Sequence, residues 1–279
     1  MITLIGIELY KLFKKWRTYI GFIAITVLVP IIQIAISIEG QKTLNFMTRS
    51  IQQSFLFVGN FLNSYLVSYL IMNSLYIHIP FLVTLAAGDL LAGEATAGTY
   101  RMLLTRPVSR FNVVTSKFLA GIIYTFLLVM WLAVLSLGIG TLIFGTGELI
   151  VMKSSALIIF SRNDILWRFA SAYIFAVISM SVVTSLAFLF SSLVENSIGP
   201  IITTMAIIIA FIIISAIDVN AFRIIKPYLF TSYMGAWSSF FDKPADLETA
   251  WKAIGVLSAH IIILFSITLY IFKKKDILT

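Results

Sequence analysis

The sequence has 279 residues, of which 60% are hydrophobic and 11% are charged. Soluble domains carry about 25% charged residues, so this composition excludes an ordinary soluble domain. The absence of cysteine excludes disulfides and thiolate metal sites. The net charge of +8 is typical of the basic flanks of membrane helices, and we expect no nucleic-acid partner.

Long apolar segments recur along the chain and predict an all-α integral membrane protein with six transmembrane helices. These segments can cross a hydrocarbon core of about 30 Å, and none shows the strict alternation of a barrel strand. We expect them to form one transmembrane domain over residues 1–279. The six predicted spans are residues 19–38, 55–86, 118–144, 164–193, 198–217 and 250–272.

Residues 1–17 are predicted to form an amphipathic helix in the plane of the lipid headgroups. Its apolar side chains recur at three- and four-residue spacing: Ile2, Ile5, Leu9, Leu12, Phe13 and Trp16. Glu8, Lys11 and Lys15 occupy another face, and we expect these lysines to point to the cytosolic lipid surface. Six spans place both termini on one side, and the basic residues beside the first and last spans indicate the cytosol.

The second predicted span, residues 55–86, carries a polar stripe. On one continuous helix the members of this stripe fall within about 140° of one another: Asn60, Asn63, Ser64, Ser68, Ser74 and His78. Polar groups in lipid need partners, so the stripe predicts either hydrogen bonds to another helix or the lining of a substrate path. The sequence Ile79-Pro80 after His78 predicts a bend.

Three segments are predicted on the outer side of the membrane, namely residues 39–51, 145–163 and 218–249. The first two are expected to be loops. The third is rich in aromatic residues, and we expect short helices that rest at the outer membrane interface. Its aromatic side chains include Tyr228, Phe230, Tyr233, Trp237, Phe240 and Phe241.

The central stretch, residues 88–110, combines charges and glycines between two long apolar segments. It predicts a short interfacial helix and then a corner at Arg106-Pro107, because proline lacks an amide and disfavours helix in the residue before it. A rigid, charged corner of this kind suits contact with a soluble partner on the cytosolic side.

Several kinds of chemistry are absent from the sequence. No GxxxxGK[ST] motif occurs, so the chain lacks a phosphate-binding loop of its own. Two histidines without cysteine make a zinc site unexpected, and no serine lies in a G-x-S-x-G motif. We therefore expect no catalytic residue, no metal and no directly bound cofactor. If the protein performs work, its energy comes from a partner.

The central stretch resembles the cytosolic loop of type-2 ABC exporter permeases. The residues that carry this resemblance are Ala92-Gly93-Glu94, Ala97-Gly98-Thr99-Tyr100, the run from Leu103 to Arg110, and Lys117. The turn Ser191–Ser197 is similar to the turn between the fourth and fifth spans of that family, although Glu195 stands where a basic residue is common. With the amphipathic amino-terminal segment and six spans, the resemblance covers essentially the whole chain.

The resemblance implies a multi-pass permease in the cytoplasmic membrane of a bacterium or archaeon. Such a subunit forms a dimer, here expected to be a homodimer, and docks on two ATP-binding cassette subunits that hold ATP and Mg. In the implied cytosolic coupling helix, Glu94, Gly98 and Arg101 share one face, and the two charges pair with the ATPase. The implied coupling residues are Asp89, Gly93, Glu94, Gly98, Thr99, Arg101, Arg106 and Pro107.

Two alternatives stay open. The first is an ABC-type subunit that relays motion to an extracytoplasmic accessory protein without transport. The second is an ion-coupled secondary carrier, which is disfavoured because the two halves show no convincing repeat and the spans carry no charge near their midplane. Membrane lipid is a further expected partner. The residues do not indicate the identity of the cargo.

Overall fold

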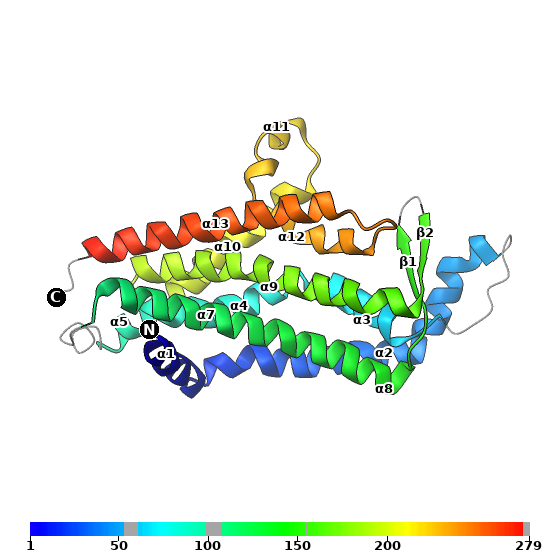
Figure 1. Ribbon diagram of the computed structural model, residues 1–279, viewed down its shortest axis with the longest axis horizontal. Helices are drawn as coiled ribbons and strands as arrows, with labels where there is room; N and C mark the ends of the chain where they lie inside the picture. The colour runs from blue at the N-terminus through cyan, green and yellow to red at the C-terminus, as the bar shows by residue number, and fades with distance from the viewer. Residues whose placement is uncertain (53–60, 99–107, 154–155, 276–279) are drawn as a thin grey trace.

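The structure is a computed structural model, and it describes residues 1–52, 61–98, 108–153 and 156–275. Long helices lie side by side along the long axis of the molecule, and both termini lie at the same end (Figure 1). In the described part of the chain, six helical segments are long and apolar enough to cross a membrane. This confirms the mostly helical fold with six span-length helices. The six segments are Arg17–Lys42, Ile79–Thr96, Arg110–Phe144, Arg162–Leu193, Ile198–Ala216 and Leu247–Lys274.

The chain begins with two helices that are joined by a sharp turn. The first, α1 (Ile2–Lys14), lies across the end of the bundle, and α2 (Arg17–Gln52) runs along its length (Figure 1). The predicted outer loop at residues 39–51 is wrong, because these residues continue α2. They include no proline and only one glycine, so no strong helix breaker ends the helix there.

The second predicted span is interrupted. Three helices follow one another along the bundle: α3 (Ser64–Leu75), α4 (Ile79–Ala87) and α5 (Asp89–Thr96). The expected continuous helix over residues 55–86 is therefore wrong, whereas the expected bend at His78 is confirmed. Pro80 lies in the first turn of α4, where its missing amide needs no partner, and this position favours the start of a new helix.

The next segment forms a nearly continuous rod and then a hairpin. Helix α7 (Arg110–Ala133) passes into a π-helical stretch η1 (Val134–Ile139) and then into α8 (Gly140–Phe144). A two-stranded antiparallel hairpin follows, made by β1 (Leu149–Lys153) and β2 (Ala156–Phe160). The sequence predicted a loop at residues 145–163, so the hairpin is an addition to the all-α prediction.

Helix α9 (Arg162–Leu193) occupies the centre of the bundle and contacts α4, α7, α10 and α13. Small side chains such as Ala172 and Thr184 are fully buried on it, which lets its neighbours approach closely. A tight turn, as predicted, leads to α10 (Ile198–Ala216). The last helix, α13 (Leu247–Lys274), returns to the end where the chain begins (Figure 1).

The aromatic-rich segment forms short helices, as expected. They are α11 (Asn220–Arg223), η2 (Lys226–Tyr228), α12 (Thr231–Met234) and η3 (Gly235–Phe241). The expected position of the aromatic rings on the surface is wrong for Trp237 and Phe241, which are 3% and 0% exposed. Both rings pack edge-on against Tyr69, so α3 removes them from the surface.

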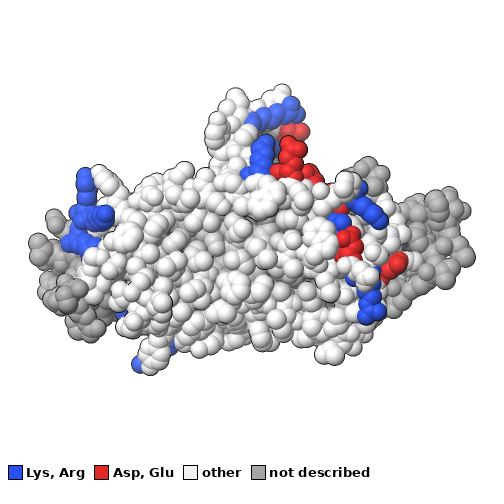
Figure 2. Space-filling view, in the orientation of Figure 1, with Lys and Arg blue, Asp and Glu red and all other residues white. Residues whose placement is uncertain are grey.

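Charged side chains gather in separate regions of the surface. Figure 2 shows Lys and Arg at one end of the long axis, and mixed charges at the other end and around α11. Between these regions, the visible face carries almost no charge (Figure 2). Large apolar side chains are exposed on α10, for example Ile202, Ile209 and Ile213.

Candidate functional site

A buried lysine joins three helices at the end of the bundle where both termini lie. The ammonium of Lys117, on α7, lies 2.6 Å from Oε2 of Glu8 on α1 and 2.9 Å from Oε1 of Glu94 on α5. Lys117 is only 1% exposed, and Lys11 also reaches both carboxylates at 3.2 and 3.0 Å. Two lysines and two glutamates therefore neutralise one another, with Lys117 buried and Lys11 partly exposed.

Asp89 extends this arrangement by a second group of contacts. Its carboxylate lies 2.6 Å from Nζ of Lys15 and 4.0 Å from Nη1 of Arg17. We call the seven residues together the inner ionic cluster: Glu8, Lys11, Lys15, Arg17, Asp89, Glu94 and Lys117. A cavity of about 20 Å³ lies among them, which has room for a single water molecule.

The sequence positions these groups through helix periodicity and one close approach. Glu8, Lys11 and Lys15 repeat at intervals of three and four residues, so α1 presents them on one face. That face meets α5 closely, because a Cβ at Gly93 would lie 2.6 Å from Oδ1 of Asp89 and 2.8 Å from Nζ of Lys15. A side chain at position 93 would therefore push the ends of Asp89 and Lys15 out of their present ionic contact.

Helix α5 is also fastened to the turn between α9 and α10. The hydroxyl of Ser191 accepts hydrogen bonds from the amides of Leu91 and Ala92 at 3.0 and 2.8 Å, and it donates to the carbonyl of Gly88 at 2.7 Å. The hydroxyl of Thr96 lies 2.8 Å from the carbonyl oxygen of Glu195. As a result, α5 is connected to α1, α7 and the α9–α10 turn at once.

The charge state of Lys11 is set by competing effects. Partial burial disfavours its ammonium, but hydrogen bonds and Coulomb attraction from Glu94 and Glu8 outweigh burial and raise the pKa of Lys11 above its usual 10.5. Lys11 therefore stays charged at all physiological pH values. The ion pairs between α1 and α5 persist under the same conditions.

The sequence predicted that Lys11 and Lys15 point to the cytosolic lipid surface. In the structure both lysines bond to carboxylates of α5, Lys11 to Glu94 and Lys15 to Asp89, while their side chains stay 38% and 44% exposed. Their position relative to the lipid surface therefore stays a prediction. Ile2 and Tyr10 on the same helix are 87% and 69% exposed.

The predicted coupling face is not formed as expected. Helix α5 ends at Thr96, and Gly98 has a left-handed φ of 65°, so no continuous helix carries Glu94 and Gly98 on one face. Glu94 points inward and is already ion-paired, so its carboxylate is not available to a soluble partner. The other predicted coupling residues lie outside the described part of the chain: Thr99, Arg101, Arg106 and Pro107.

The predicted polar stripe divides into two groups because α3 ends at Leu75. Ser64 and Ser68 are fully buried, and the hydroxyl of Ser68 donates to the carbonyl of Ser136 in the π-helical stretch at 2.9 Å. Ser74 and His78 are exposed, and Nδ1 of His78 lies 3.0 Å from the backbone carbonyl oxygen of Ser74.

Asn63, at the start of the stripe, caps α3 and donates to the carbonyl of Glu148 at 2.6 Å. The side chains of Asn63, Ser68 and His78 thus bond within and between elements, whereas the buried hydroxyl of Ser64 has no hydrogen-bond partner among the described residues. None of them lines either of the two cavities described next, so the substrate-path interpretation stays a prediction. Asn60 lies outside the described residues.

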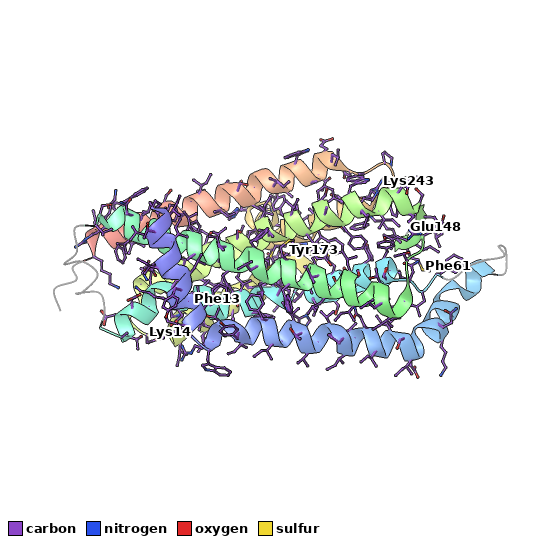
Figure 3. All side chains as sticks on the ribbon, turned by 60° about the horizontal axis from the view of Figure 1, so that its bottom comes forward. Phe13, Lys14, Phe61, Glu148, Tyr173 and Lys243 are labelled. Atoms are coloured by element: carbon purple, nitrogen blue, oxygen red, sulfur yellow. The ribbon has the colours of Figure 1, made fainter. Side chains whose placement is uncertain are left out.

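Two cavities meet near the break between α3 and α4. One is small and mostly apolar, and it includes Tyr173, which is buried in the middle of the bundle (Figure 3). The other is open, has a volume of about 540 Å³, and lies between the end of α10, the segment 226–235 and α13. Tyr76 and Met234 contribute to both cavities.

A second buried cation, at the opposite end of the bundle, was missed by the sequence analysis. Arg168 is 5% exposed and bonds to Asp164 at 2.8 Å, to the carbonyl of Asp242 at 2.8 Å and to the carbonyl of Phe240. Its guanidinium also lies 4.3 Å from the ring centre of Phe160 on the hairpin. The four-residue spacing of Asp164 and Arg168 could have predicted their ion pair on one helix. The contacts of Arg168 with backbone carbonyls could not be predicted from the sequence.

Within residues 1–52, 61–98, 108–153 and 156–275, no group of three or more His, Cys, Asp or Glu residues is arranged to hold a metal ion. The inner ionic cluster has three carboxylates, but lysines and an arginine already neutralise them. Its arrangement suits a mechanical connection between helices rather than catalysis.

Comparison with known proteins gives a family and a distant relative. Residues 19–278 match the model of a family described as "Protein of unknown function (DUF2705)". The "Uncharacterized protein YhcI" of Bacillus subtilis (strain 168) is 25% identical over 205 residues, which cover 71% of this chain. The match spans 64% of the length of that relative, just under two thirds.

Proposed function

The chain belongs to the DUF2705 family, and from the arrangement of its residues we propose that it is the transmembrane permease subunit of an ABC transporter. It would couple ATP hydrolysis on separate ATP-binding subunits to export across the cytoplasmic membrane. The resemblance of residues 92–110 to type-2 ABC exporter permeases first indicates this function.

The observation that carries the proposal is the position of α5. This eight-residue helix lies at the end of the bundle, and side-chain contacts fasten it to α1, α7 and the α9–α10 turn. Because packed helices and buried ion pairs resist independent movement, a push on α5 would displace several spans together. A membrane subunit driven by a soluble ATPase requires such a connection.

The distribution of side chains supports a location in the membrane. The visible face between the charged regions is almost free of charge (Figure 2), and α10 exposes several isoleucines along its length. We place both termini in the cytosol, where Lys273, Lys274 and Lys275 would lie close to anionic headgroups. The exposed Tyr10 and Trp16 of the α1 region would rest at the same interface.

The proposed docking surface differs from the one predicted by sequence. Since Glu94 is engaged inside the protein, we assign the contact to the exposed tip of α5, Thr96, Ala97 and Gly98. Gly93 and Asp89 then lie on the side of α5 that contacts Lys15 and do not touch the partner. The complete assembly would contain two copies of this chain and two ATP-binding subunits with their ATP and Mg.

An alternative within the same assembly is a relay of motion to an extracytoplasmic partner without transport. One observation favours it: Arg168 fastens the hairpin and the end of η3 to α9, so that the outer end of the bundle is firmly built. A rigid outer end could transmit a displacement that begins at α5. Cargo movement in proteoliposomes would exclude this alternative.

The test begins with a search for a gene that encodes a P-loop ATPase beside the gene for this chain. Co-expression of the two proteins, purification and measurement of ATP hydrolysis then follow. Ala97→Glu places a charge on the exposed tip of α5 and should abolish co-purification, whereas Ala97→Ser is the matched control and should leave it intact. The proposal fails if both variants assemble equally well, or if no neighbouring gene encodes such an ATPase.

A further inference from the structure

The open cavity near the end of α10 has a wall that is held in place by side chains. The hydroxyl of Ser215, on the last turn of α10, lies 2.9 Å from that of Thr231 and 3.0 Å from that of Ser232. Tyr233 donates its hydroxyl to the carbonyl of Pro227 at 3.0 Å. These contacts fix the segment 226–235 over the end of α10.

A contact from α13 holds the same segment from the other side. Nε2 of His260 lies 3.1 Å from the carbonyl oxygen of Tyr228. The cavity of about 540 Å³ is therefore a built feature between two long helices, and not a gap beside a loose loop.

Two lysines line this cavity without an ion-pair partner. Neither Lys226 nor Lys252 has a carboxylate within 4.0 Å among the residues that the structure describes. The nearby Asp218 is already paired with Arg223, at 3.4 Å. Because both lysines line the same cavity, an anion bound in it would meet positive charge from α13 and from the segment 226–235.

The rest of the lining determines what kind of anion fits. Ser215, Thr231 and Ser232 also line the cavity; their two mutual hydrogen bonds use two of their three hydroxyl hydrogens, so one hydroxyl donor remains for a group with acceptor oxygens. Ile77 and Ile212 supply an apolar side to the same cavity. A phosphate with an attached apolar portion matches both surfaces, because its oxygens can meet the donors while its carbon chain covers the isoleucines.

We propose that this cavity binds the phosphate group of an amphiphile, with Lys226 and Lys252 as its charged contacts. Its level in the membrane rests on the proposed function: α10 has 19 residues, which corresponds to a length of about 28 Å, close to the thickness of the hydrocarbon core. The cavity at its outer end then lies at the level of the outer phospholipid headgroups.

The experiment is native mass spectrometry of the purified full-length chain in detergent. Phosphatidylglycerol, phosphatidylcholine and inorganic phosphate are the three probes. We expect the chain to retain phosphatidylglycerol in preference to phosphatidylcholine, because the choline group brings a positive charge to the lysines. The double variant Lys226→Gln/Lys252→Gln should reduce the binding of phosphatidylglycerol about tenfold.

Two controls make the result specific to the cavity. Lys226→Arg/Lys252→Arg keeps both charges and should keep the binding, and Lys42→Gln removes one charge at an exposed position paired with Glu39 and should have no effect. Binding of inorganic phosphate alone would support a phosphate site but overturn its assignment to an amphiphile. An unchanged preference in the double glutamine variant would overturn the whole proposal.

The assay contains no ATP-binding subunit, so its failure is distinguishable from a failure of the proposed coupling. Loss of the lipid preference with normal ATPase assembly would leave the role of α5 intact. Conversely, absence of an ATPase partner would leave the binding measurement valid.

Discussion

Lys117 and Arg168 are both almost completely buried, at opposite ends of the bundle, but their partners differ in kind. Lys117 meets two side-chain carboxylates, each from another helix. Arg168 meets one carboxylate on its own helix and two backbone carbonyls of the segment that follows α12. Figure 3 shows how far apart the two regions lie, with Phe13 and Lys14 at one end and Glu148 and Lys243 at the other.

This difference teaches how each end of the bundle can respond to force. Side-chain carboxylates can rotate and exchange partners, and Glu8 and Glu94 each already touch both Lys117 and Lys11. Backbone carbonyls are fixed by the chain that carries them, so Arg168 has one arrangement. We therefore interpret the inner ionic cluster as a connection that tolerates small movements and the region around Arg168 as a rigid fastening.

The largest effect is expected from Lys117→Met. This substitution removes the central cation and leaves the buried carboxylates of Glu8 and Glu94 to share Lys11. Removing one partner of a buried ion pair costs about 3–5 kcal/mol, and Lys11 offsets part of that cost. Thermal unfolding of the detergent-solubilised chain should show a large decrease in midpoint temperature.

The control for this prediction removes the stranded charges as well. The triple variant Glu8→Gln/Lys117→Met/Glu94→Gln should recover much of the lost stability, because no uncompensated carboxylate remains near Lys117. If Lys117→Met unfolds at the wild-type temperature, the cation does not hold the three helices together.

Arg168→Met should have the second largest effect. Hydrogen bonds to charged groups contribute about 1.5–3 kcal/mol each. Part of this loss is offset at the partly buried carbonyl of Asp242, which can bind water, but not at the buried carbonyl of Phe240. Limited proteolysis should show faster cleavage of the hairpin, while the inner end stays protected. Arg162→Met, an exposed position on the same helix, should leave the cleavage rate unchanged.

Asn63→Ala tests the cap that starts α3. Loss of an N-cap side chain costs about 0.5–2 kcal/mol, and this asparagine also donates to the carbonyl of Glu148 before the hairpin. We expect a modest decrease in midpoint temperature. Asn73→Ala removes an exposed amide within α3 and should be nearly neutral, and equal effects of the two substitutions would contradict the capping role.

The smallest effect concerns the pH dependence of Lys11. Its raised pKa means that its contribution to stability is fully present below 10.5 and is lost as the pH rises through the folded pKa. The stability difference between wild type and Lys11→Met should be about 1 kcal/mol or less, because the lysine is partly exposed. Denaturant titrations from neutral to alkaline pH should show this difference shrinking only above 10.5; a loss at lower pH would contradict the assignment.

Much of the fold was predictable because long apolar segments with clear ends leave few choices. The fourth and fifth spans were predicted at residues 164–193 and 198–217, and the structure has them at Arg162–Leu193 and Ile198–Ala216. The bounds of the second span were predicted wrongly because length and hydropathy do not reveal that Asn63 starts a helix or that the segment after Pro80 extends to Thr96, although the proline did indicate the bend. The hairpin was not predicted, because its two strands of five residues each are too short to show a clear two-residue alternation.

The candidate site was less predictable for a different physical reason. An amphipathic pattern shows that Glu8 and Lys11 share a polar face, but the pattern is the same whether that face meets water or the charges of another helix. The choice is made by Asp89 and Glu94, more than 70 residues away along the chain. The carbonyl partners of Arg168 leave no trace in the sequence, since every residue has a carbonyl.

The most direct test of the central claim is cross-linking from a single cysteine on the tip of α5. The chain has no cysteine, so Ala97→Cys provides one unique thiol, and Ile159→Cys on the exposed side of the hairpin provides the matched control. In membranes that contain the neighbouring P-loop ATPase, Ala97→Cys should form a cross-link with that subunit and Ile159→Cys should not. Equal yields from both positions, or labelling of Ala97→Cys from outside the cell by a membrane-impermeant reagent, would contradict the account.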